Sequence, residues 1–393
     1  MDRTPVLLFV VNEPYFFVSH RMPLALAARQ AGYRVHIAAP DENAWAPKGF
    51  AARSYFEKFD LAYHDIPLSR RGTNPLKELS TIAALLALYR RLRPDIVHHI
   101  SAKAVLYGGL AARLLNVPAV VNAFPGLGHH FINSGLRARL FRWALVRGYR
   151  LSSRRPNARV IVQNPDNALA LERFGVAPRE QMVLTRGSGV SLDEFPAAPF
   201  AEGPALVVLP ARMIWEKGIG TFVEVARGLK NAGVEARFAL VGNTHPSNPQ
   251  AVPEARLREW HQEGVVEWWG RRDDMSAVFA AARVICLPSE YGEGIPKALL
   301  EAAASGRPIV TYDAPGCREA VRDGLSGILV PLGDRKALAG ALRRLIEDPP
   351  LCQRLGAEAR ALAETEFSVE RVVALTIEIY RELAPVDTPA PAL

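Results

Sequence analysis

Two glutamates, Glu293 and Glu301, stand in a segment whose pattern predicts a strand followed directly by a helix. The apolar run at 283–287 is typical of a short buried strand, and 296–304 predict a helix with Pro296 at its first position. Glu293 is therefore expected at the carboxyl end of the strand, where doubly wound sheets bind ligands. Glu301 lies about one and a half turns inside the helix. By spacing alone, these acids also fit an ordinary helix start and a solvated side chain.

The start of this predicted helix suits a phosphate group. Gly294 lets the backbone approach a ligand closely, and the first amides of a helix, at its positive dipole end, bind anions. This junction can therefore hold a nucleotide-linked sugar, on a loop made by four consecutive residues: Gly294, Ile295, Pro296 and Lys297.

A second loop supplies the positive charge that a diphosphate requires. Arg212 and Lys217 come soon after the strand predicted at 205–209. The guanidinium offers a planar fork of donors and the ammonium a compact charge, so the pair can neutralise the two phosphates of a nucleotide diphosphate. Taken singly, both residues also fit ordinary surface charges. Gly242 ends the next predicted strand and is expected to line the same site.

Three segments in this order resemble the retaining family 4 glycosyltransferases: 288–301, 311–319 and 324–331. The resemblance runs through almost the whole chain. It implies an α/β protein with two facing Rossmann-like doubly wound parallel sheets and an interdomain cleft, the fold called GT-B.

The same resemblance implies roles for individual residues. Glu293 would face the sugar ring and its anomeric region, and Glu301 would accept hydrogen bonds from the ribose. Arg212 and Lys217 would stabilise the leaving diphosphate, so we predict Glu293, Lys217 and Arg212 as the catalytic residues. The donor-binding set also includes a segment similar to the family's glycine-rich loop, which equally fits a simple turn: Gly187, Ser188 and Gly189.

The acceptor is expected on the first half of the chain, on loops at predicted strand ends. These loops resemble the branch of the family that builds bacterial surface polysaccharides and lipid-linked glycans. The chain departs from the wider family by aromatic residues where many members have paired glycines, and by Pro125 where many have a histidine. His129 or His130 would replace that histidine, or both are structural. The acceptor-side set is Asn12, Tyr15, Phe16, His20, Lys103, Gly126, His129 and His130.

Strand and helix patterns alternate along the chain, which predicts parallel sheets covered on both faces. Strands are expected at 6–11, 34–39, 95–100, 119–122 and 160–163, with helices at 20–31, 75–92 and 103–115. A proline-rich stretch near residue 198 predicts a linker. The expected division is a first domain at 1–197, a second at 198–367, a helix at about 368–384 that by resemblance rejoins the first domain, and a disordered tail at 385–393.

Charge is unevenly distributed along the 393 residues, whose net charge is +8. Residues 1–200 carry 26 Lys and Arg against 14 Asp and Glu, and seven arginines without an acid fall between 134 and 155. A basic amphipathic helix at about 136–155 fits an anionic membrane surface, although it also fits a packed helix with a solvated arginine face. Nucleic acid is not expected as a partner, because no recognition motif is present.

No apolar run approaches the roughly 20 residues that a membrane helix needs. We therefore expect a cytoplasmic protein, peripherally associated with the inner face of the cell membrane.

The three cysteines show neither metal-ligand nor disulfide spacing. No Asp-x-Asp sequence occurs, so no metal and no cofactor is expected.

These patterns predict a retaining glycosyltransferase that uses a nucleotide-diphosphate sugar, with UDP-N-acetylhexosamine expected from the branch resembled. The acceptor would be a polyprenyl-diphosphate-linked or other glycan. Three alternatives stay open: a different donor such as GDP-mannose, a nucleotide-sugar epimerase of related architecture, and a non-catalytic sugar-binding module.

Overall fold

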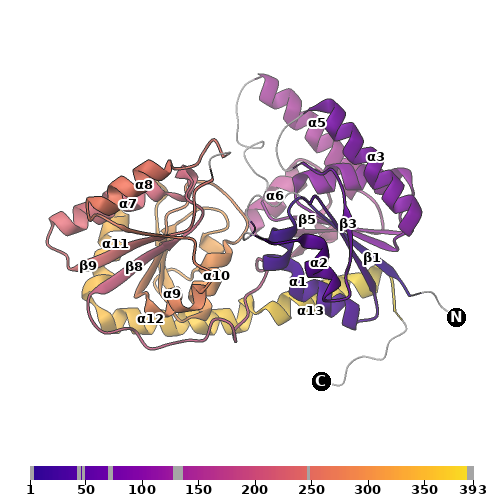
Figure 1. The fold of residues 1–393 in the computed structure, drawn as a ribbon. Helices are drawn as coiled ribbons and strands as arrows, with labels where there is room; N and C mark the ends of the chain where they lie inside the picture. Colours follow the sequence, from indigo (N-terminus) through magenta and orange to yellow (C-terminus); the bar gives the residue numbers. More distant parts are fainter. Residues whose placement is uncertain are drawn as a thin grey trace. The chain divides into compact units, whose positions relative to one another are not determined.

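The computed structural model describes residues 4–41, 46, 49–69, 74–126, 136–245 and 248–386. The chain forms two compact units, and each contains one sheet (Figure 1). Unit 1 comprises Met1–Ser188 and Val372–Leu393, and unit 2 comprises Gly189–Arg371. The chain thus passes from unit 1 to unit 2 after Ser188 and returns after Arg371.

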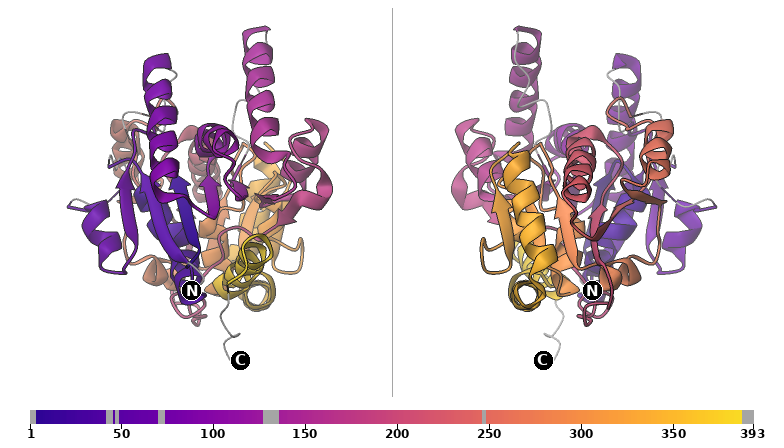
Figure 2. Two further views of the ribbon diagram at one scale, coloured as in Figure 1. Left: turned by 90° about the vertical axis from the view of Figure 1, so that its right-hand side faces the viewer. Right: turned by 90° about the vertical axis from the view of Figure 1, so that its left-hand side faces the viewer.

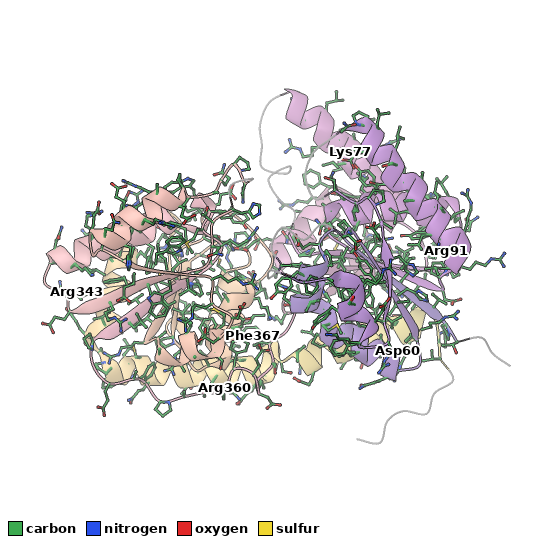
Figure 3. The ribbon with its side chains drawn as sticks, in the orientation of Figure 1. Asp60, Lys77, Arg91, Arg343, Arg360 and Phe367 are labelled. Atoms are coloured by element: carbon green, nitrogen blue, oxygen red, sulfur yellow. The ribbon has the colours of Figure 1, made fainter. Side chains whose placement is uncertain are left out.

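The proline-rich stretch expected as a linker packs inside unit 2. The guanidinium of Arg307 donates to the carbonyl oxygens of Ala198 (2.8 Å) and Pro199 (3.3 Å). Arg360, labelled in Figure 3, donates to the carbonyl of Phe195 at 3.0 Å. The passage between the units therefore comes before this stretch, at Ser188 and Gly189, rather than at residue 198.

Unit 1 holds a parallel seven-stranded sheet in the order β3-β2-β1-β4-β5-β6-β7. The order runs outward from β1 in both directions, so the sheet is doubly wound and its switch point lies between β1 and β4. The strands are β1 (Val6–Val11), β2 (Arg34–Ala39), β3 (Ala62–Asp65), β4 (Ile96–Ile100), β5 (Ala119–Phe124), β6 (Ala158–Val162) and β7 (Met182–Leu184).

The helices of unit 1 connect consecutive strands. They are α1 (Pro14–Gln30), α2 (Ala52–Glu57), α3 (Pro75–Leu92), the π-helix η1 (Ala104–Gly108), α4 (Gly109–Leu114), α5 (Leu136–Ser153), α6 (Pro165–Arg173) and the short 3-10 turn η3 (Arg179–Gln181). The last helix, α13 (Val369–Leu383), returns to this unit, where the hydroxyl of its buried Tyr380 lies 2.5 Å from Nδ1 of His98 on β4.

Unit 2 holds a parallel six-stranded sheet in the order β10-β9-β8-β11-β12-β13. Its switch point lies between β8 and β11. The strands are β8 (Ala205–Pro210), β9 (Ala236–Val241), β10 (Glu267–Gly270), β11 (Val284–Leu287), β12 (Ile309–Tyr312) and β13 (Gly327–Val330). The helices are η4 (Trp215–Lys217), α7 (Ile219–Asn231), α8 (Glu254–Gln262), α9 (Met275–Ala281), α10 (Lys297–Ala304), η5 (Arg318–Ala320), α11 (Arg335–Glu347), α12 (Pro349–Leu362) and the π-helix η6 (Ala363–Phe367).

Hydrophobic patterning explains why these segments form a sheet core. All residues of β1, β5, β8 and β11 are buried, as expected for strands covered by helices on both faces. Together with the helices around it, each sheet has its own apolar core.

Two expected helix starts were wrong. The segment after β1 is not a loop, because α1 begins at Pro14 and includes Tyr15, Phe16 and His20. Proline is favoured in the first turn of a helix, where no amide partner is needed. In the glutamate segment Pro296 does not occupy the first helical position but caps the helix with extended backbone, and α10 begins at Lys297.

Candidate functional site

The candidate site lies at the carboxyl ends of β8 and β11 in unit 2. These strands pair directly, with Val207 opposite Val284 and Val208 opposite Ile285. Because β8 and β11 run parallel to each other, the loops that follow them leave the sheet at the same edge, at its switch point. The loop after β8 leads to Lys217 in η4, and the loop after β11 carries Glu293.

Lys217 and Glu293 form a close ion pair, although 76 positions separate them in the sequence. The Nζ atom of Lys217 lies 2.6 Å from both carboxylate oxygens of Glu293. The Ser289 hydroxyl donates to Oε1 of the same carboxylate at 3.0 Å. Lys217 is only 7% exposed, so this pair is held with little help from water.

The charge of Lys217 is maintained by its surroundings. Burial alone would lower the pKa of Lys217, but the Glu293 carboxylate and the Tyr291 phenol offset this effect and raise the pKa above its ordinary value. Nζ of Lys217 also lies 5.5 Å from the ring centre of Tyr291, within the range of a cation–π contact. The ammonium therefore stays charged throughout the physiological pH range.

Arg212 lies close enough to Tyr291 for its charge to affect the pKa of that phenol. Burial raises the pKa of the Tyr291 phenol, although the charges of Lys217 and Arg212 both act to lower it. Both predicted cations thus lie near one aromatic ring. Gly242, at the end of β9, lies beside this loop, because the amide of Ala211 bonds the carbonyl of the neighbouring Val241 at 3.0 Å.

Two glycines allow the site loops to approach closely. Gly218 follows Lys217 with φ +73°, and a Cβ at this position would lie 2.0 Å from the carbonyl oxygen of Pro288. Gly316, in the loop after β12, has φ +91°, and a Cβ there would lie 2.2 Å from the carbonyl oxygen of Gly294. A side chain at Gly218 would push the Lys217 loop away from the loop after β11, and one at Gly316 would push the loop after β12 away from the segment of Glu293 and Gly294.

Glu301 is buried in α10 and pairs with Lys297 one turn earlier, at 3.3 Å. Burial raises the pKa of Glu301 above its ordinary value, Lys297 counteracts this shift, and the charge of Glu194 adds to it. Gly294, Ile295 and Pro296 are buried between Glu293 and α10. The structure thus gathers Glu293, Glu301 and the four predicted donor-binding residues 294–297 in one loop and helix start.

The segment with Gly187, Ser188 and Gly189 lies where the chain passes between the units. Gly189 has φ +77°, and a Cβ there would lie 2.5 Å from the Cα of Val369. Its place beside a donor stays a prediction.

Unit 1 carries the predicted acceptor side. Asn12 follows β1, and the ring of Phe16 stacks on His20 in α1 with centres 4.2 Å apart. Tyr15 contacts Phe50 edge to face at 5.5 Å. Gly126 lies just after β5, and the predicted His129 and His130 lie outside the described residues.

Lys103 lies near the switch point of unit 1, after β4. Its Nζ atom pairs with Oε1 of Glu78 on α3 at 2.6 Å. Ser101, at the end of the same strand, has φ +102°, which is strained for a residue other than glycine. Strained backbone of this kind concentrates at functional sites.

Sequence reasoning did not assign roles to Ser289, Tyr291, Gly316 and Ser101. The first two stand within the glutamate motif, and Gly316 follows a proline, so a turn signal was present in the sequence. Nothing in the residue types around Ser101 predicts its backbone strain.

This arrangement can stabilise negative charge that develops on a leaving group. Fixed cations and amides in a site poor in water act most strongly on such charge. Within the described ranges, no group of three or more His, Cys, Asp or Glu side chains is placed to hold a metal ion.

Two family models match the chain, one in each half. Residues 6–154 match the family described as Glycosyl transferase 4-like, and residues 204–348 match Glycosyl transferases group 1. Among curated proteins, the chain is 28% identical over 355 residues to the N,N'-diacetylbacillosaminyl-diphospho-undecaprenol alpha-1,3-N-acetylgalactosaminyltransferase of Campylobacter jejuni, covering 86% of this chain and 89% of that enzyme. It is 24% identical to the UDP-Gal:alpha-D-GlcNAc-diphosphoundecaprenol alpha-1,3-galactosyltransferase of Escherichia coli, covering 73% of this chain and 75% of that one.

Solved structures share the fold. Anabaena Alr3699/HepE in complex with UDP superposes with a TM-score of 0.76 at 18% identity, covering 96% of this chain and 100% of that one. Sucrose-phosphate synthase from Thermosynechococcus elongatus gives a TM-score of 0.78 at 20% identity, covering 96% and 99%. These likenesses confirm the predicted α/β class with two Rossmann-like parallel sheets.

Proposed function

Because the chain is a glycosyltransferase whose halves belong to the glycosyl transferase 4-like and group 1 families, we propose that it moves a sugar from a nucleotide diphosphate to a lipid-linked glycan. The donor is a UDP-N-acetylhexosamine and the anomeric configuration is retained. The acceptor is a polyprenyl-diphosphate-linked glycan of bacterial polysaccharide or glycoprotein assembly. The names of the Campylobacter and Escherichia relatives, with their diphospho-undecaprenol acceptors, support this choice.

One observation carries the proposal: the ion pair of Lys217 and Glu293 at the switch point of unit 2, with Arg212 beside it. A neutral sugar alone needs no such cations, whereas a diphosphate does. The complexes of Anabaena Alr3699/HepE with UDP and with UDP-glucose support a uridine donor. GDP-mannose is the alternative donor.

In the proposed reaction the bond between the anomeric carbon and the β-phosphate oxygen breaks, and a bond from that carbon to the acceptor oxygen forms on the same face. Arg212, Lys217 and the first amides of α10 stabilise the charge on the departing diphosphate. The acceptor hydroxyl passes its proton to an oxygen of the leaving phosphate. Glu293 holds Lys217 and faces the sugar, and Glu301 accepts hydrogen bonds from the ribose.

The enzyme reaches a lipid-linked acceptor from the membrane surface, through the basic helix α5. This helix spans Leu136–Ser153 and carries five arginines and no acid. The aromatic groups of such a helix enter the headgroup layer of an anionic bilayer, and its arginines contact the lipid phosphates. In the part of the chain that the structure covers, no helix has the length and hydropathy to cross a membrane.

A transfer assay tests the proposal. Purified protein is incubated with UDP-GalNAc, UDP-GlcNAc or GDP-mannose, with and without a polyprenyl-diphosphate-linked monosaccharide. Mass spectrometry should show one added N-acetylhexosamine, and NMR of the product should show an axial anomeric bond as in the donor. Isomerised donor without acceptor would instead identify an epimerase, and sugar binding without nucleotide binding would identify a binding module.

A further inference from the structure

Four of the five most exposed large apolar side chains described in unit 1 lie in the first halves of two helices, α3 and α5. Leu76 and Leu79, in the first turns of α3, are 77% and 62% exposed. Leu140 and Trp143, in the first half of α5, are 67% and 61% exposed. Single exposed leucines are ordinary, but neighbouring groups of large apolar side chains indicate a surface that another partner covers.

The fold brings both helix starts to one edge of unit 1. In a parallel sheet each connecting helix runs opposite to its strands, so its first turns lie at the edge where the strands end. This edge also carries Asn12 and Lys103, which follow β1 and β4. Figure 2 shows α3 and α5 rising on the same side of unit 1, and α4 packs against both. Figure 3 marks the two ends of α3 with Lys77 and Arg91.

A buried hydrogen-bond network fixes the other ends of the two helices to the sheet. The ring of His99 on β4 lies between the hydroxyl of Tyr89 on α3, 2.9 Å from Nε2, and Oδ1 of Asn122 on β5, 2.7 Å from Nδ1. The amide of Asn122 donates to the hydroxyls of Ser152 (2.9 Å) and Ser153 (3.0 Å) at the end of α5. Both helices are therefore held at their carboxyl ends, and their first turns project from a firm base.

The charged side chains beside these apolar residues indicate the kind of partner. Arg139 and Arg147 are exposed on α5, and the guanidinium of Arg147 lies 5.5 Å from the ring centre of Trp143. Arginine beside tryptophan suits the interface of an anionic bilayer, where the ring enters the headgroup layer and the cation contacts phosphate. On α3 the exposed leucines stand beside Lys77, and the one acid of these turns, Glu78, is paired with Lys103.

We propose that the first turns of α3 are a second bilayer contact beside α5, so that the edge of unit 1 carrying the acceptor-side loops faces an anionic membrane. This inference rests on the proposed function, which requires a lipid-linked acceptor. It goes further by naming the second contact, Leu76 and Leu79, and the edge that meets the lipid.

Site-specific fluorescence tests this contact. The native cysteines, Cys286, Cys317 and Cys352, are all buried, so an introduced cysteine can be labelled selectively. An environment-sensitive fluorophore is placed at L79C, at L140C and at L114C. Leu114 is a matched control, because it is 68% exposed but ends α4 and therefore lies at the opposite edge of the sheet.

With vesicles of phosphatidylglycerol and phosphatidylcholine, we expect blue-shifted emission from the labels at 79 and 140 and no shift from the label at 114. A response at 140 without a response at 79 would overturn the second contact, as would an equal response at 114. This readout does not depend on activity, so it remains valid if the proposed reaction fails.

An activity measurement separates docking from chemistry. The double variant Leu76→Glu with Leu79→Glu should transfer sugar to an acceptor embedded in anionic vesicles at least about tenfold more slowly than wild type, since burying each leucine contributes measurably to partitioning. With a short-chain, water-soluble acceptor its rate should equal that of wild type. Equal rates in vesicles would contradict the inference, whereas loss of transfer by wild type with both acceptors would contradict the proposed function.

Discussion

At the level of single residues, the proposed reaction depends on Lys217 and Glu293. Each neutralises the other in the structure, and each is predicted to contact a different part of the donor. A donor diphosphate would share the ammonium, which has three donor hydrogens, with the carboxylate that holds it. In the proposed reaction the ion pair would therefore both hold the two loops together and supply the positive group that stabilises the leaving diphosphate.

We predict that Lys217→Ala and Glu293→Ala each lower kcat on the order of 10²–10³-fold, because each removes a charge contact that acts in the transition state. Lys230→Ala is the matched control, since Lys230 is exposed on α7 and donates to the carbonyl of Gly264. Steady-state rates, with circular dichroism to check folding, give the comparison. Rates within a factor of about two of wild type for both site variants would show that the chemistry occurs elsewhere.

Glu301 gives a prediction in which stability and function oppose each other. Burial raises the pKa of Glu301, so the folded state binds its proton more tightly than the unfolded state does. The contribution of Glu301 to the free energy of unfolding is therefore favourable at low pH, and it is lost as the pH rises through the raised pKa of this carboxyl group. Glu301→Gln should therefore raise the thermal midpoint more at about pH 7.5 than at about pH 4.5, while weakening nucleotide binding. An equal effect at both pH values would contradict the burial argument.

At the scale of elements, close packing of the loops after β8, β11 and β12 positions the site. Gly218→Ala should destabilise unit 2 and weaken donor binding, because its Cβ would lie 2.0 Å from the carbonyl oxygen of Pro288. Gly228→Ala is the control, because Gly228 lies in α7 with open space around the added carbon. This change should stabilise the protein by about 0.5–1 kcal/mol, since alanine favours helix. The thermal midpoints of the Gly218→Ala and Gly228→Ala variants should therefore shift in opposite directions. Shifts of the same sign and size would contradict the packing argument.

Most elements were predictable from local pattern. The strands at 6–11 and 34–39 have the expected bounds, because each is a clear apolar run. The helix at 369–383 lies within one residue of the bounds expected at about 368–384. The start of α1 at Pro14 was not predictable in this way, because the aromatic residues that follow it stand where many family members have a glycine-containing loop. The π-helical turn at 104–108 also has no signature that local pattern can detect.

The candidate residues of the site could be selected from the sequence, but their contacts could not. The residue types and their positions after strands indicated Arg212, Lys217, Glu293 and Glu301. The direct pairing of Lys217 with Glu293 depends on the register of β8 with β11, which no local pattern specifies. The network of Tyr89, His99 and Asn122 is likewise a result of tertiary packing.

At the scale of the whole molecule, the chain passes twice between the units, and the two passages lie side by side. Val190 bonds Phe367 (2.9 Å) and Val369 (3.0 Å) through the backbone, next to the passage at Gly189. The proline-rich stretch that follows is fixed by Arg307 and Arg360. On the side of unit 2, the residues next to both passages are therefore held by backbone and guanidinium hydrogen bonds.

The proposed function requires that Lys217 and Arg212 hold a nucleotide diphosphate at the switch point of unit 2. Calorimetric titration of UDP into wild type, Lys217→Ala, Arg212→Ala and the control Lys230→Ala tests it directly. We expect the affinity for UDP to fall at least about tenfold in both site variants, as expected for lost charge-assisted hydrogen bonds, and to stay unchanged in the control. Equal affinity in all four proteins, or no binding of UDP or GDP by wild type, would contradict the account.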